Sequence, residues 1–155
     1  MRGNLRIWLL LMATFVIAET VCAQGIPNAI PCMGKAVSGM PVQVTQNTGP
    51  VPAWAMTSWP GGLPMTTYGP MYFRLPPLIQ RFTSLHECGH ASTLNPNEYA
   101  ANCFALANGG FSPAEIDAIG TFYLNLPGVF PPQYGGSGPA FWQGTFALCP
   151  NLIPH

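Results

Sequence analysis

Two of this chain's three histidines lie four residues apart, with a glutamate directly after the first, in the segment 84-SLHECGHASTLNPNEYAANC-103. On an α-helix each residue advances about 100°, so His86 and His90 lie about 40° apart around the axis and one turn apart along it. Two imidazoles placed in this way can reach one metal ion, and Glu87 lies near the same side. The pattern indicates two zinc ligands, His86 and His90, with Glu87 as a general base.

The alternative interpretation is a helix that carries two partly exposed histidines and binds no metal. The H-E-x-x-H pattern is short, and it also arises by chance. Two features of the composition favour the metal site. The chain has one further histidine, and two of the four acids after residue 23, Glu87 and Glu98, lie within twelve residues of each other beside the histidine pair. We therefore expect Zn²⁺ as the cofactor.

A zinc site needs a third ligand, and Glu98 is the first acid after His90. A local role competes, because Asn95 and Glu98 have the spacing of a capping box, in which the glutamate would accept from the cap N–H. Asn102 favours the ligand role, since it lies one turn beyond Glu98 and its side-chain oxygen could accept the outer N–H of a ligating histidine. A site that uses Cys103 with the histidines is a further alternative.

Four helices are expected to position these residues. Prolines at 76 and 77 suit a helix start, because the N–H that proline lacks has no partner in a first turn. Ser112 and Glu115 have the spacing of a capping box, so the role of Glu115 is structural. The predicted spans are Pro77 to about Thr93, residues 96–107 after an Asn95 cap, Pro113 to Leu126, and residues 139–149.

The part of the chain before these helices predicts short strands. Residues 24–64 are interrupted by many prolines and glycines, with β-like pieces such as 42–46. Residues 65–73 indicate a strand or strand pair broken at Gly69–Pro70, and proline confines such a strand to a sheet edge or a bulge. Trp54 is expected to pack in the core or against loops. Short strands followed by about four helices indicate a small single-domain α+β fold.

The N-terminal residues have the pattern of an export signal. Arg2 and Arg6 precede an unbroken apolar run, Ile7 to Ala18, and small residues lie before Gln24. This predicts a signal peptide over residues 1–23 and a mature domain over residues 24–155, with an uncleaved N-terminal anchor as the alternative. We therefore expect an exported protein, either periplasmic or secreted.

The charge pattern limits the partners of the mature domain. After residue 23 the chain has three basic and four acidic side chains, and no basic patch. Nucleic acid is an unfavourable partner for such a surface. No polybasic or amphipathic cationic helix is present either, so stable membrane association is not expected after signal cleavage.

An even number of cysteines follows the predicted signal peptide: Cys32, Cys88, Cys103 and Cys149. In an oxidising compartment they indicate two disulfides, for which three connectivities are possible. Cys88 points about 160° away from His90 on the same helix, and Cys103 lies on the next helix. We expect these two to pair, contributing about 3 kcal/mol, and Cys32 to pair with Cys149 by elimination.

The motif H-E-C-G-H, followed by E-x-x-A-N-C at Glu98–Cys103, resembles the zincin metallopeptidases of gluzincin type. More narrowly, it is similar to small exported bacterial zincin-like proteins, and the specific match covers residues 78–107. The resemblance implies a zincin-like fold, zinc ligands His86, His90 and Glu98, and Glu87 as general base. It also implies that a peptide or protein substrate lies along a sheet edge over the helix, for which 65–73 is the candidate.

The function implied is zinc-dependent hydrolysis of peptide bonds, with Glu87 accepting the proton of the attacking water. A group that stabilises the developing negative charge could come from Tyr99, Tyr123 or Tyr134, although packing is the favoured role for each of them. One alternative is a zincin-like protein that binds zinc but has lost turnover. Another is a disulfide-stabilised secreted interaction module whose histidines bind nothing.

Overall fold

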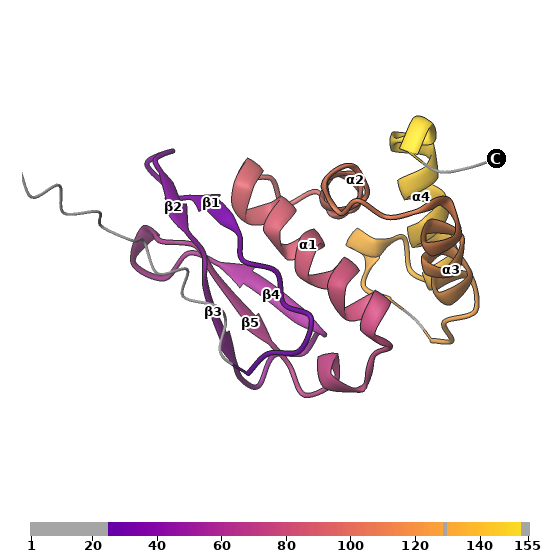
Figure 1. The fold of residues 1–155 in the computed structure, drawn as a ribbon, viewed down its shortest axis with the longest axis horizontal. Coiled ribbons are helices and arrows are strands. Elements are labelled where there is room, and N and C mark those ends of the chain that lie inside the picture. The colour runs from indigo at the N-terminus through magenta and orange to yellow at the C-terminus, as the bar shows by residue number, and fades with distance from the viewer. Residues whose placement is uncertain (1–24, 129, 153–155) are drawn as a thin grey trace, which may run out of the picture.

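The computed structural model describes residues 25–128 and 130–152 (Figure 1). The predicted signal peptide, residues 1–23, lies outside the described residues. Within them all strands precede all α-helices, so the expected α+β order is confirmed. The strands are β1 (Met33–Lys35), β2 (Pro41–Gln43), β3 (Thr45–Thr48), β4 (Ala55–Ser58) and β5 (Met65–Tyr68). The α-helices are α1 (Pro77–Thr93), α2 (Glu98–Asn108), α3 (Pro113–Leu124) and α4 (Gly138–Leu148), and the 3₁₀ turns are η1 (Pro60–Gly62), η2 (Tyr72–Arg74), η3 (Pro132–Tyr134) and η4 (Pro150–Leu152).

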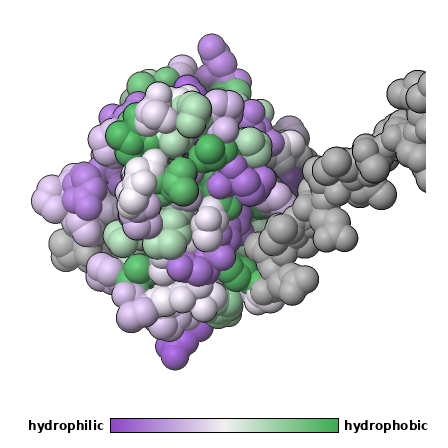
Figure 2. All heavy atoms as spheres, turned by 90° about the vertical axis from the view of Figure 1, so that its left-hand side faces the viewer, coloured by the Kyte–Doolittle hydropathy of each residue, from purple (hydrophilic) through white to green (hydrophobic). Residues whose placement is uncertain are grey.

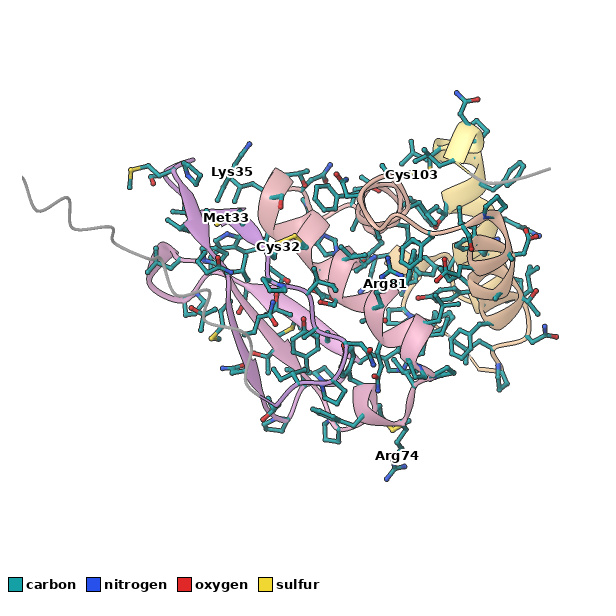
Figure 3. The ribbon with its side chains drawn as sticks, viewed as in Figure 1. Cys32, Met33, Lys35, Arg74, Arg81 and Cys103 are labelled. Carbon is teal, nitrogen blue, oxygen red and sulfur yellow. A yellow bond between two sulfur atoms is a disulfide. The ribbon has the colours of Figure 1, made fainter. Side chains whose placement is uncertain are left out.

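Helix α1 runs through the middle of the molecule, with the strands on one side and α2, α3 and α4 on the other (Figure 1). Its apolar residues Ile79, Phe82 and Leu85 are buried in the main core with residues of α2, α3 and α4. Burial of each such side chain contributes roughly 1.5–3 kcal/mol. Arg81 on the same helix, labelled in Figure 3, donates to the carbonyl of Gly109, and its guanidinium lies over the ring of Phe111, just before α3. On the strand side, Cys88 and Ala91 of α1 pack with Cys32 and Val44, so the helix that carries the H-E-x-x-H motif is held from both sides.

The strands form two small sheets. In one, β1 and β2 pair antiparallel; in the other the order is β3-β5-β4, with β3 parallel and β4 antiparallel to β5. The predicted strand 42–46 is divided between the two sheets. Val44 separates its two halves, and its N–H donates to the carbonyl of Cys32 at 2.9 Å. One extended segment therefore joins both sheets.

The prediction that 65–73 is an edge strand is wrong. Its strand ends at Tyr68, β5 lies between β3 and β4, and residues 72–74 form the turn η2. The proline at 70 comes after the strand, so it does not restrict the pairing of β5. A side chain at Gly69 would meet the carbonyl oxygen of Ala53, so this position needs glycine. The edges of this sheet are β3 and β4.

The helix predictions differ from the structure mainly at α2. Helix α1 ends at Thr93, as expected, and Leu94 follows in the left-handed region with φ of 55°. Helix α3 begins with the predicted capping box. Helix α2 begins at Glu98 rather than 96, because Asn97 is the cap and accepts from the N–H of Ala100 at 2.9 Å. The interpretation of Glu98 as the acid of a capping box is therefore wrong.

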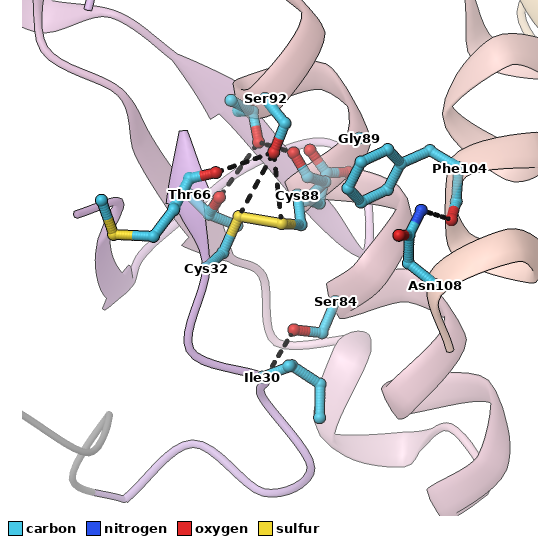
Figure 4. Close-up of a disulfide and its surroundings, with 12 residues drawn as sticks. Ile30, Cys32, Thr66, Ser84, Cys88, Gly89, Ser92, Phe104 and Asn108 are labelled. Atoms are coloured by element: carbon cyan, nitrogen blue, oxygen red, sulfur yellow. Dashed lines mark hydrogen bonds between the residues drawn. A yellow bond between two sulfur atoms is a disulfide. The ribbon is translucent and has the colours of Figure 1, made fainter. Parts of the chain in front are cut away.

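The predicted disulfide connectivity is also wrong. The bonded pairs are Cys32–Cys88, with Cα atoms 5.8 Å apart, and Cys103–Cys149, with Cα atoms 5.9 Å apart. The first bond joins the start of β1 to α1, and Ser92 lies beside it and donates to the carbonyl of Met33 at 2.8 Å (Figure 4). Closing loops of this length stabilises the fold by about 4 kcal/mol for each bond in the chain-entropy account.

The reason for the different pairing lies in the position of α2. Helix α2 brings Glu98 to the histidine face of α1, and at Gly89 the two backbones are so close that a Cβ would lie 3.0 Å from the Cα of Ala101. Cys88 points away from His90 and therefore away from α2. It faces the strands, while Cys103 faces the end of α4 (Figure 3).

The surface of the described part is mixed in polarity. On the strand side, apolar side chains are scattered among polar ones (Figure 2). The large apolar residues that are most exposed are Met33, Val37, Met40, Leu63 and Leu148. Among the described residues, no helix is both long enough and apolar enough to cross a membrane.

Candidate metal centre

The three predicted ligands lie together in a buried cluster at the junction of α1 and α2. His86 and His90 are 7% and 8% exposed, and their Nε2 atoms are 3.1 Å apart. The Oε2 of Glu98 lies 3.0 Å from the Nε2 of His86 and 3.3 Å from that of His90. One potential ligand atom from each of the three residues lies within 4.8 Å of the other two. This geometry matches a three-ligand metal site in residue type and spacing.

The short connection between α1 and α2 positions Glu98. Leu94 reverses the chain after α1, and the side chain of Asn95 accepts from the N–H of Asn97 at 2.9 Å. The carboxylate of Glu98 is then the first side chain of α2 and points to the histidines. Four residues are therefore enough to bring a carboxylate from a second helix to the H-E-x-x-H face.

The tautomer of His90 follows from its outer contact. Its Nδ1 lies 2.7 Å from the backbone carbonyl oxygen of Asn95. A carbonyl oxygen can only accept, so Nδ1 carries the proton and donates. In the neutral ring the lone pair is then on Nε2, which faces Glu98.

The tautomer of His86 follows from a longer chain of hydrogen bonds. The hydroxyl of Thr145 lies 3.0 Å from the carbonyl of Phe141, so it donates there and accepts from the amide Nδ2 of Asn102 at 2.6 Å. This orientation turns the Oδ1 of Asn102 toward the Nδ1 of His86, 2.8 Å away. Nδ1 therefore donates, and the lone pair of the neutral ring lies on Nε2. Asn102 thus makes the contact expected from its spacing.

Two imidazole lone pairs and a carboxylate oxygen therefore converge on one point. Burial would raise the pKa of Glu98, but hydrogen bonds from His86 and His90 outweigh it and lower the pKa to about 2. Burial lowers the pKa of His90, but its hydrogen bonds to Glu98 and Asn95 outweigh this and raise the pKa above its usual 6.5. Without a cation, Glu98 forms an ion pair with a histidine of the cluster when that ring is protonated. A divalent cation can replace that proton.

Glu87 lies beside the cluster at the wall of a cavity of about 380 Å³. It is 5% exposed, and its Oε2 has no hydrogen-bond partner among the described residues. Its backbone carbonyl accepts from the Oγ1 of Thr57 in β4 at 3.2 Å. The cavity is mainly apolar, and its lining is Val51, Pro52, Ala53, Trp54, Ala55, Met71, Thr83, His86, Glu87, Tyr123, Phe130, Pro131, Tyr134 and Phe141.

Of the three candidate tyrosines, Tyr123 and Tyr134 line this cavity, and Tyr99 is not among its lining residues. Burial raises the pKa of Tyr134, and the negative charges of Glu98 and Glu87 raise it further. The phenol of Tyr134 therefore stays protonated over the neutral range and can donate a hydrogen bond. The loop that carries it is closed by a hydrogen bond from the N–H of Phe130 to the carbonyl of Gly136 at 2.9 Å.

Other candidates for the site do not join it. Cys103 is bonded to Cys149, so the alternative zinc site that uses Cys103 as a thiolate ligand is contradicted. Three contributors carry no local sequence signal. Thr145 reaches Asn102 from α4, the carbonyl of Asn95 is backbone, and Trp54 lines the cavity from the strand side, in addition to packing against Tyr123 as expected.

Comparisons with known proteins give no relative for this chain. No protein-family model matches it, and neither a curated protein nor a solved structure matches it. The interpretation of the site therefore depends on its own geometry and chemistry.

Proposed function

We propose that this protein is an exported zinc-dependent metallopeptidase. The observation that carries the proposal is the convergence of the His86, His90 and Glu98 acceptor atoms beside the unpartnered carboxylate oxygen of Glu87. Two imidazole nitrogens and one carboxylate oxygen are a donor set typical of catalytic zinc. Such sites have three protein ligands and keep a further position open for water or substrate.

The side chains around the cluster have complementary roles in this proposal. Zinc in this site would lower the pKa of bound water to about 7 and polarise a substrate carbonyl. The carboxylate of Glu87 takes a proton from the attacking water and returns it to the departing amine nitrogen. The hydroxyl of Tyr134 donates a hydrogen bond to the carbonyl oxygen of the substrate as negative charge develops there.

The edge strand β4 supports a peptide as substrate. It lies against α1, and the carbonyl of Trp54, just before the strand, accepts from the N–H of Gly69 at 2.8 Å. In an antiparallel pair successive residues alternate in direction, so the backbone groups of Ala55 and Thr57 face away from β5. An extended peptide can add to this edge next to Glu87. In our proposal the sheet edge that binds the peptide substrate is therefore β4, and not residues 65–73.

A second candidate function is zinc binding without turnover. The observation that favours it is Asn102, whose neutral amide accepts the outer N–H of His86. A carboxylate in that place would stabilise developing positive charge on the ring more strongly than an amide does. In this case the site would hold a metal for structure or for partner recognition. A module that binds no metal is the third alternative.

Two measurements distinguish these functions. Elemental analysis of the mature protein should give about one zinc per chain, lost in His86→Ala, under both zinc proposals. A quenched-fluorescent peptide library should be cleaved by the parent protein and not by Glu87→Gln. Asp117→Asn is the matched control, because it makes the same acid-to-amide change at an exposed position of α3. Zinc without cleavage would support the binding protein, and a chain without zinc would contradict both.

A further inference from the structure

The cavity beside Glu87 can be entered from solvent and offers mainly apolar walls. Three residues of its lining, Pro52, Met71 and Pro131, are exposed, Met71 by 51%. Glu87 is the only acid among the lining residues that the structure describes, and none of them is a lysine or an arginine. The volume of about 380 Å³ lies in the range of roughly 300–1,000 Å³ that is usual for ligand sites.

Four aromatic side chains form a continuous part of the cavity wall. The ring centroid of Trp54 lies 6.1 Å from that of Tyr123, and the ring of Tyr123 lies 5.3 Å from that of Phe141. The ring of Phe141 in turn lies 6.4 Å from that of Phe130. The four rings come from four separate segments of the chain and support one another, so this wall is formed before a ligand binds.

The pairing of β4 determines the direction in which a bound peptide points its side chains. Ala55 of β4 pairs with Tyr68, whose hydroxyl lies 3.0 Å from the Oγ of Ser84 on α1. Directly paired residues of neighbouring strands share one face of the sheet, so Ala55 and Tyr68 both face α1. A substrate residue that pairs with Ala55 at the free edge of β4 points its side chain to the same face. Ala55 also lines the cavity, so that side chain meets the cavity there.

We propose that the cavity binds a bulky apolar side chain of an extended peptide, with an aromatic ring favoured, while the peptide backbone pairs with β4 at Ala55. The ring of the substrate lies against the aromatic wall that includes Trp54 and Phe130. Burial of such a ring raises affinity much more than burial of a methyl group, because the gain grows with the apolar area removed from water. A charged side chain would leave water for apolar walls, and a glutamate would also meet the carboxylate of Glu87. The inference rests on the proposed function for its peptide substrate.

The test measures binding, so that it does not depend on turnover. The probes are the N-acetyl N-methylamides of L-phenylalanine, L-alanine, L-lysine and L-glutamate, titrated into the mature protein and followed by NMR. The phenylalanine probe should bind about tenfold more tightly than the alanine probe, and both charged probes should bind more weakly than the phenylalanine probe. Phe130→Ala should weaken binding of the phenylalanine probe by about three- to tenfold. Phe73→Ala is the matched control, because Phe73 is 41% exposed and is not part of the cavity lining.

Two results would overturn the proposal. One is equal affinity for the phenylalanine and alanine probes, or tightest binding of a charged probe, in the parent protein; this comparison needs no variant to fold. The other is an unchanged affinity for the phenylalanine probe in a folded Phe130→Ala protein. A phenylalanine preference in a chain that cleaves no peptide would contradict the proposed function and leave the binding preference of the cavity standing. Cleavage of peptides without a preference for bulky apolar residues would do the reverse.

Discussion

The Nε2 atoms of His86 and His90 lie 3.1 Å apart and both face one carboxylate oxygen of Glu98. Both rings donate from Nδ1 to fixed acceptors, so the inner nitrogens of the neutral rings have only lone pairs to offer. Three acceptors at this separation repel one another unless a proton or a cation lies among them. The outer hydrogen bonds therefore prepare the inner atoms for a positive ion.

Replacing Glu98 should test its role as a ligand. Glu98→Gln keeps the size of the side chain but removes its charge, and it should lower zinc affinity by more than the 10- to 100-fold expected for loss of an outer partner. Competition with a chromogenic chelator measures the affinity. Asp117→Asn should leave it unchanged, and a Glu98→Gln protein with the parent affinity would show that Glu98 is no ligand.

Thr145 should influence zinc binding, although in the described part of the chain its hydrogen bonds go to Asn102, Phe141 and Cys149 and not to the histidines or Glu98. Thr145→Val removes the acceptor of the Asn102 amide, leaves that buried amide unpaired, and should cost about 1–3 kcal/mol of unfolding free energy. It should also weaken zinc binding by about 10- to 100-fold through the orientation of His86. Thr93→Val is the matched control, since within residues 25–128 and 130–152 its hydroxyl donates to the carbonyl of Gly89 alone. Equal zinc affinity in both variants would exclude the network from the site.

The stability of the metal-free protein should depend on pH in two steps. The pKa of Glu98 falls from 4.5 to about 2 on folding, so its contribution is full above pH 4.5 and is lost as the pH falls toward 2. The pKa of His90 is raised above 6.5, so its contribution is full below pH 6.5 and is lost as the pH rises through the folded value. The cluster therefore stabilises the metal-free fold most between pH 4.5 and 6.5.

Zinc should have the opposite pH preference, because it binds neutral imidazoles and displaces the proton. Added zinc should raise the melting temperature by more at about pH 8 than at about pH 5.5, measured against protein stripped with a chelator. In Glu98→Gln this difference should be reduced. A zinc-induced shift that is larger at the lower pH would contradict the assignment of the histidines as ligands.

Gly89→Ala should disturb the site without removing a ligand. The added Cβ would lie 3.0 Å from the Cα of Ala101 and 3.1 Å from its carbonyl oxygen, so α1 and α2 must separate. Overpacking of this kind costs about 1–3 kcal/mol. Zinc affinity should fall because Glu98 moves with α2. If calorimetry shows lower stability and unchanged zinc affinity, the close contact serves packing alone.

Local signals predicted the helices well. The capping box at Ser112 and the end of α1 at Thr93 depend on residues within one turn, and both match the structure. The sequence predicts the start of α2 two residues early, at residue 96 after an Asn95 cap, whereas Asn97 caps the helix in the structure. The grouping of His86, His90 and Glu98 could also be predicted from local signals, because these residues lie on adjacent helices with a short connection.

Features that depend on residues distant in the sequence could not be predicted. The central place of β5 requires knowing that β3 and β4 pair on its two sides, and the disulfides require knowing on which side of α1 the second helix packs. Thr145 meets Asn102 across 43 residues of sequence. The lining of the cavity comes from several segments of the chain, so its residues, Thr83 among them, cannot be identified from the sequence alone.

The bond between Cys32 and Cys88 lies within the motif itself, since Cys88 separates Glu87 from Gly89. A reduced chain presents four thiols, and thiolates are among the strongest zinc ligands available to a protein. Such a chain can trap the ion at sulfur, away from the histidines. Oxidation withdraws those competitors, so in the proposed zinc protein the disulfides would have to form before the metal is loaded. The compartment that oxidises the cysteines would then also determine which donor atoms the metal finds.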